Sequence, residues 1–79
     1  MNEHRKEILD LRGEICPFTF VYTKLKLEKM RKNELLEVIL DYPLAIENVP
    51  RSVKDQNLGE ILEIVKIGDK LWKIIIQKL

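Results

Sequence analysis

The chain has very few of the residues on which metal sites, disulfides and phosphate-binding loops depend. Its 79 residues include one cysteine, one histidine and three glycines. Two potential ligands are too few for a structural zinc site, and the glycines lie far apart in the sequence, unlike those of a phosphate-binding loop. A single cysteine also excludes an internal disulfide, so packing has to hold the fold. The sequence therefore predicts no metal and no cofactor.

The charges of the chain nearly balance, and its apolar runs are short. Fourteen basic and thirteen acidic residues leave a formal charge of +1, which creates no overall field that would attract nucleic acid. No apolar run approaches the roughly 18 to 20 residues that span a bilayer, and the polar start MNEHRKEI is not typical of a signal peptide. Because an unpaired thiol fits a reducing compartment, we expect a soluble cytoplasmic protein.

Length and periodicity predict one small domain over residues 1–79, in which residues 1–6 are flexible. Residues 7–11, EILDL, predict a short strand in which Ile8 and Asp10 face one way and Glu7, Leu9 and Leu11 the other, and which is ended by Gly13. We then expect a helix that ends at about residue 31 or 32. Proline suits the first helical position, so Pro17 is placed there and Cys16 becomes the N-cap.

The middle of the chain predicts a second strand and a second helix. Residues 35–41 form a dense apolar run with β-branched members, which is typical of a buried strand. Residues 47–57 predict a short helix with Asn48 as its N-cap and Pro50 in its first turn. Asn57 suits the position just after the helix, because asparagine tolerates a left-handed conformation.

The last third of the chain predicts a β-hairpin. Residues 60–66 and 71–78 are strand-like, and Gly68-Asp69 supplies the turn. Three consecutive isoleucines, residues 74–76, indicate a strand that is central in its sheet or covered on both faces. The order βαβαββ predicts an α/β (α+β) fold, a two-layer sandwich whose four-stranded mixed sheet carries two helices on one face.

Cys16 is the best candidate for a reactive group. Its expected position at a helix N-terminus favours the negatively charged thiolate, and Arg12 in the same loop would add positive charge. The alternative is that Cys16 packs as a small, inert hydrophobic residue, as single cysteines commonly do. Local sequence does not separate these two interpretations.

A thiol without a neighbouring base indicates a carrier rather than a hydrolase. Cysteine proteases and acyl transferases need a positioned histidine, and the single histidine here is His4, in the polar N-terminal segment. A lone thiol can still accept a group from a partner enzyme and pass it on.

Several landmarks resemble the TusA/SirA-like sulfur-carrier family, whose signature is a C-P-x-P motif. The resemblance covers about residues 8 to 78. Its landmarks are Leu9-Asp10-Leu11-Arg12-Gly13, then Cys16-Pro17, then Asp41, Pro43, Val49-Pro50 and Lys78.

The resemblance implies a βαβαββ two-layer domain in which Cys16 is the catalytic residue and Pro17 fixes the helix start. In such proteins the cysteine takes a persulfide sulfur from a cysteine desulfurase or a rhodanese-like protein. It then hands the sulfur to an acceptor protein in tRNA thiolation, molybdenum-cofactor synthesis or sulfur metabolism. We expect a monomer or a weak dimer that acts with these partner enzymes.

The chain departs from the family pattern close to the motif. Thr19 stands where the motif has its second proline, and its hydroxyl is able to bond locally. Asn48 stands where the family usually has aspartate. These departures indicate a divergent branch.

The first helix is apolar on two sides. The resemblance places Phe20, Leu27 and Met30 on the sheet. The other side, beside Cys16, then carries Phe18, Val21, Tyr22 and Leu25. We expect this second side to dock a sulfur donor, an acceptor or a second copy of the chain. Alternatively, the N-terminal segment half-covers it.

A second functional hypothesis is a non-catalytic regulatory or RNA-binding module of the same fold. It depends on the basic run KLKLEKMRK, residues 24–32, which is otherwise a solvated helix face. Aromatic stacking platforms are scarce, which argues against direct nucleic-acid binding.

Overall fold

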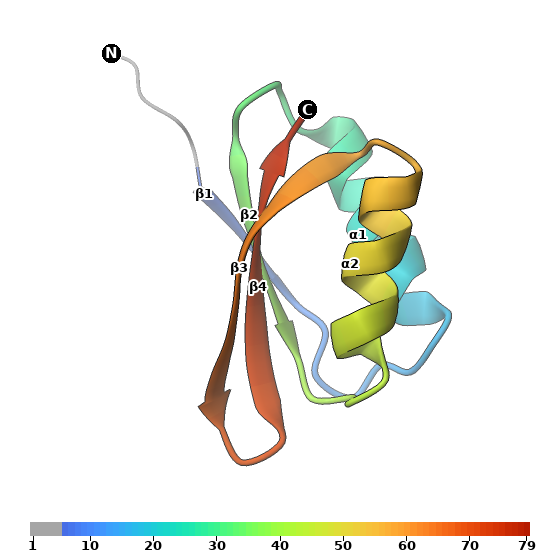
Figure 1. The fold of residues 1–79 in the computed structure, drawn as a ribbon, viewed down its shortest axis with the longest axis vertical. Coiled ribbons are helices and arrows are strands. Elements are labelled where there is room, and N and C mark those ends of the chain that lie inside the picture. Colours follow the sequence, from blue (N-terminus) through green and yellow to red (C-terminus); the bar gives the residue numbers. More distant parts are fainter. Residues whose placement is uncertain (1–5) are drawn as a thin grey trace.

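The computed structural model describes residues 6–79, which form a two-layer α+β sandwich (Figure 1). The elements follow the predicted order βαβαββ. They are β1 (Lys6–Asp10), α1 (Phe18–Lys29), β2 (Leu35–Leu40), α2 (Ala45–Asp55), β3 (Gly59–Gly68) and β4 (Leu71–Lys78). The sheet order is β1-β2-β4-β3, with β1 parallel to β2 and the other pairs antiparallel. Both helices cover one face of the sheet, as predicted. His4 and most of the segment predicted to be flexible lie outside the described residues.

The core lies between the sheet and the helices. Alternate residues of β2, namely Leu36, Val38 and Leu40, are completely buried because they point to the helices. Ile74 and Ile76 of β4 are equally buried and pair with β2 in register. The run of isoleucines is confirmed as a central strand, because β4 lies between β2 and β3.

The two sides of α1 are divided as expected. Leu27 and Met30 are buried, and Phe20 packs half-buried against the same core. On the opposite side of the helix, each apolar residue is between 40% and 50% exposed. We call this side the α1 stripe; it consists of Phe18, Val21, Tyr22 and Leu25. The alternative, that the N-terminal segment covers it, concerns residues outside the described range.

Both ends of α1 differ from the prediction by one to three residues. Pro17 is the N-cap and Phe18 the first helical residue, so Cys16 lies one position before the cap. The helix ends at Lys29 because Met30 adopts an extended conformation, which directs its side chain into the core. The predicted turn follows, with Asn33 in a left-handed conformation at a φ of 74°.

The start of α2 was predicted wrongly. The helix begins at Ala45, three residues before Asn48, so Asn48 lies inside the helix and does not cap it. The turn that starts the helix forms at Pro43, and Ala45 N–H donates to the Tyr42 carbonyl at 3.0 Å. Proline pre-sets a helical φ, so Pro43 initiates the helix as well as following the strand. Pro50 consequently lies inside α2 rather than in its first turn.

The end of α2 follows the prediction, and the hairpin turn is shifted by one residue. Asn57 is left-handed, with a φ of 56°, and Leu58 N–H donates to the Val53 carbonyl at 3.0 Å, which closes the helix. In the hairpin, β3 includes Gly68, so Asp69-Lys70 forms the turn. Within residues 6–79, no helix has the length and apolar character needed to cross a membrane.

Candidate functional site

Cys16 lies in the loop between β1 and α1, at the end of the sheet where the parallel strands β1 and β2 finish. Because β1 and β2 run parallel, the segments that follow them leave the sheet on the same side. The Gly13 N–H donates to both carboxylate oxygens of Asp41, at 2.9 and 3.2 Å. Gly13 adopts a φ of 87°, which glycine reaches without a steric penalty. Asp41 therefore ties the Cys16 loop to the end of β2.

The loop delivers Cys16 to the N-terminus of α1. Thr19 N–H donates to the Ile15 carbonyl at 3.2 Å and Val21 N–H donates to the Pro17 carbonyl at 3.1 Å, so the first turn encloses Cys16. Among the described residues, no side chain caps this helix. Cys16 is a half-buried free thiol that packs against the core.

The buried side chain of Thr19 contacts the Cys16 sulfur. Its side chain is completely buried, and its Oγ1 lies 3.6 Å from the Cys16 Sγ, with either atom able to donate. The Thr23 hydroxyl donates to the Thr19 carbonyl at 2.7 Å, so both buried threonines have partners. The prediction that the Thr19 hydroxyl bonds locally is confirmed.

Asn48 reaches the same sulfur from the other helix. Its Nδ2 donates to the Cys16 Sγ at 3.6 Å, although 32 positions separate the two residues in sequence. Sequence reasoning missed this contact because it assigned Asn48 to a helix cap. The available signal was topological: α2 follows β2, whose end is adjacent to the Cys16 loop.

Arg12, which we expected to add positive charge near the thiol, forms an ion pair with Asp10. Its guanidinium binds the carboxylate of Asp10, with an Nη2 to Oδ2 distance of 2.6 Å. The hydrogen bonds from Arg12 hold the pKa of the Asp10 carboxyl below its ordinary value. Within residues 6–79, no group of three or more potential ligands is placed to hold a metal ion.

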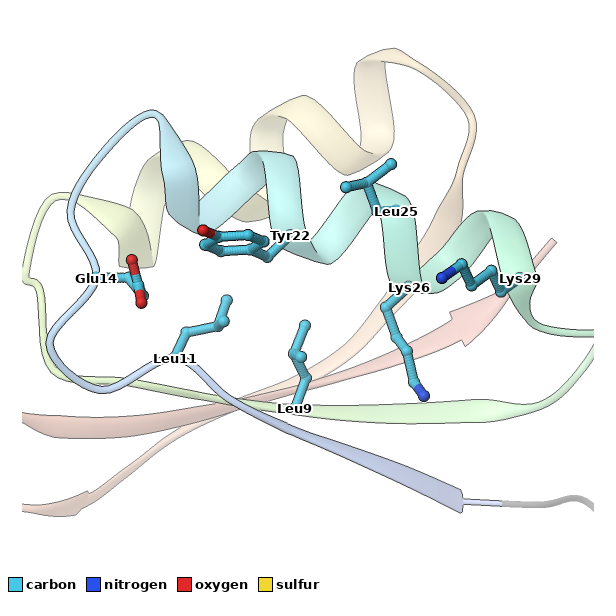
Figure 2. Close-up of a pocket in the computed structure, with 7 residues that line it drawn as sticks. All are labelled: Leu9, Leu11, Glu14, Tyr22, Leu25, Lys26 and Lys29. Atoms are coloured by element: carbon cyan, nitrogen blue, oxygen red, sulfur yellow. The ribbon is translucent and has the colours of Figure 1, made fainter.

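A shallow groove of about 450 Å³ lies between β1 and α1 (Figure 2). Leu9 and Leu11 form its apolar floor, the ring of Tyr22 lies across from them, and Leu25, also of the α1 stripe, completes the apolar lining. Lys26 and Lys29 line the end toward the C-terminus of α1, and Glu14 lines the other end. Cys16 does not line the groove. The α1 stripe therefore continues into a concave apolar surface that begins close to the loop carrying Cys16.

Comparisons with known proteins agree on one family. The family model described as "Sulfurtransferase TusA" matches residues 7–78. A "Putative sulfur carrier protein" of Archaeoglobus fulgidus is 53% identical over 72 residues, which cover 91% of this chain and 81% of that relative. A protein of the same description from Thermotoga maritima is 49% identical over 70 residues, which cover 87% of this chain and 86% of the relative.

Less similar proteins match this chain over nearly the same length. The "Putative sulfur carrier protein YedF" of Escherichia coli is 34% identical over 70 residues, covering 89% of this chain and 88% of the relative. The crystal structure of a SirA-like protein from Desulfitobacterium hafniense superposes with a TM-score of 0.76 at 17% identity. It covers 89% of this chain and 93% of that one, which confirms the fold. With the family model spanning nearly all of its residues, the chain belongs to the TusA sulfurtransferase family.

Proposed function

We propose that this TusA-family sulfur carrier accepts a persulfide sulfur on Cys16 and relays it to an acceptor protein. The observation that supports the proposal most strongly is the placement of Cys16. A half-buried free thiol precedes a helix N-terminus and has hydrogen-bonding neighbours from both helices. Unpaired N–H groups at a helix start favour a negative sulfur, which is the nucleophilic form.

The relay consists of two exchanges at sulfur. The Cys16 thiolate attacks the outer sulfur of a donor persulfide, forms a new S–S bond and releases the donor thiolate. Cys16 then carries the persulfide and its proton. In the second exchange, an acceptor thiolate attacks the outer sulfur, and Cys16 leaves as a thiolate. Each bond that breaks is replaced by one that forms, so neither exchange needs an oxidant or a metal.

The same mechanism requires two protein partners that cover the surface around Cys16. A cysteine desulfurase or a rhodanese-like protein would supply the sulfur, and a second protein would receive it. Because sulfur passes directly between two cysteines, the partner must contact the exposed residues beside Cys16. Ile15, directly before the thiol, and Phe18, two residues after it, are 54% and 50% exposed. We therefore propose the α1 stripe as the docking surface for the sulfur donor.

The alternative role as an RNA-binding module has weaker support. Of the basic run in residues 24–32, Lys26 pairs with Glu7 at 3.2 Å. Lys29, Arg31 and Lys32 are exposed, but they lie at the end of α1 opposite to Cys16. RNA binding that falls steeply with salt and survives Cys16→Ala would favour this alternative.

Sulfur transfer from a purified donor tests the proposal. The protein is incubated with a cysteine desulfurase and radiolabelled cysteine, and in parallel with a rhodanese and labelled thiosulfate. We expect label on the wild-type chain that is released by a thiol reductant and absent from Cys16→Ala. A wild-type chain that takes no label from either donor would contradict the proposed function.

A further inference from the structure

We infer that Asn48 donates a hydrogen bond that stabilises the negatively charged form of the Cys16 sulfur. This inference rests on the proposed carrier function, since it assigns a new role to a residue at that same site. Asn48 projects from the first half of α2, and its Nδ2 lies 3.6 Å from Sγ. The side chain is half-buried, so water only partly replaces the contact when it is lost.

The chemistry of the amide explains why its nitrogen faces the sulfur. A thiolate offers only lone pairs, so an N–H donor is attracted to it and an amide oxygen is repelled. The Thr19 hydroxyl, also 3.6 Å from Sγ, is able to rotate and donate as well. Two neutral donors, one from each helix, therefore surround the sulfur, while the guanidinium of Arg12 binds Asp10.

The two donors differ in their access to the outer sulfur of a persulfide. That sulfur lies about 2 Å beyond Sγ, at the length of an S–S bond. Thr19 is completely buried, so its hydroxyl is confined beside the inner sulfur. Asn48 is half-buried, so its amide is the donor that has room to turn toward the outer sulfur. We therefore expect the Asn48 amide to donate to Sγ in the empty carrier and, once the persulfide has lost its proton, to the outer sulfur in the loaded one.

Three substitutions at Asn48 separate charge from packing. Asn48→Asp places a carboxylate at nearly the same distance from Sγ. Even at the dielectric constant of water, Coulomb's law then predicts about sevenfold less thiolate at neutral pH, and partial burial enlarges this loss. Asn48→Ala removes the donor without adding charge, so we expect the amount of thiolate to fall about three- to tenfold. Asn48→Gln keeps an amide donor and should recover much of the wild-type behaviour.

Asn57→Asp is the matched control. It changes the same chemical groups, but at a position just beyond the C-terminal end of α2, about 14 Å further along the helix axis. Because Asn57 lies just after the end of α2, its substitution adds an identical charge that is remote from the thiol. We expect this variant to behave like the wild type in every assay of Cys16.

The measurement is the rate of Cys16 alkylation by iodoacetamide across the pH range in which the thiol ionises. We expect the pH–rate profile of Asn48→Asp to move to higher pH, with Asn48→Ala between it and the wild type. The inference is overturned if Asn48→Asp and Asn57→Asp have the same profile. Circular dichroism shows whether each variant folds, and if Asn48→Asp does not, the comparison of Asn48→Ala with Asn48→Gln decides.

Alkylation requires no sulfur donor, so it separates this inference from the proposed function. A shifted profile in a protein that never accepts persulfide sulfur would support the role of Asn48 and contradict the carrier function. Normal persulfide loading with unshifted profiles would support the carrier function and contradict the role of Asn48. If both hold, we expect persulfide loading to slow in Asn48→Asp by at least the same factor as alkylation.

Discussion

Replacement of Asp41 by alanine tests whether the loop that carries Cys16 is anchored as the structure indicates. The half-buried carboxylate accepts the Gly13 N–H at 2.9 and 3.2 Å. A hydrogen bond to a charged group contributes about 1.5 to 3 kcal/mol, and partial exposure places this one near the lower limit. We therefore expect Asp41→Ala to lower the free energy of unfolding by about 1.5 kcal/mol. For a chain of this size, this corresponds to a Tm lower by about 6 to 12 °C.

Urea denaturation followed by circular dichroism measures the loss of stability, and amide hydrogen exchange measures the Gly13 N–H directly. Asp41→Asn keeps an acceptor oxygen without the charge, so its effect should be smaller. Asp55→Ala, at the exposed end of α2, is the control and should change stability by less than about 0.5 kcal/mol. Equal midpoints for Asp41→Ala and Asp55→Ala, with Gly13 equally protected in both, would refute the anchoring role.

Three further substitutions test other parts of the structure. Gly59→Ala should lower the free energy of unfolding by about 1 to 3 kcal/mol, because its Cβ would lie 2.5 Å from the Ile76 Cγ2; unchanged urea denaturation would contradict this close packing. Because Arg12 lowers the Asp10 pKa in the folded state, the ion pair should stabilise the protein fully above about pH 4 and lose this effect as the pH falls further. Denaturation at several pH values should thus show a difference between the wild type and Asp10→Asn near neutral pH that disappears in strong acid, and a constant difference would disprove the assignment. Leu25→Glu, at a side chain 50% exposed, should leave stability nearly unchanged but slow sulfur transfer from the donor; unchanged transfer and oligomeric state would exclude the α1 stripe as a docking surface.

The strands and the two-layer arrangement were predictable because burial of one sheet face leaves a local signature. The dense apolar run of β2 and the isoleucine run of β4 arise because side chains of both strands meet the helices. The exposed α1 stripe was also predictable, since helical periodicity and the family resemblance together assign one side to the sheet. Asn57 was placed correctly because few residues tolerate a left-handed helix end.

The surroundings of the thiol were only partly predictable because they depend on contacts between distant segments. The contact between Asn48 and Cys16 requires that α2 starts at the edge where the Cys16 loop leaves the sheet, which no local pattern encodes. The ion pair of Arg12 with Asp10 was overlooked although it is local, since Asp10 lies only two residues away. Thr19 was recognised as a departure from the motif, but its complete burial emerges from the packing of α1.

The most direct test of the central claim is the intact mass of the protein after incubation with a cysteine desulfurase and cysteine. We expect a gain equal to the mass of one sulfur atom, located on Cys16 by peptide mapping and removed by a thiol reductant. Cys16→Ala treated in the same way should show no gain. An equal gain in Cys16→Ala, or no gain in the wild type with either a desulfurase or a rhodanese, would contradict the assignment of Cys16 as the sulfur-carrying residue.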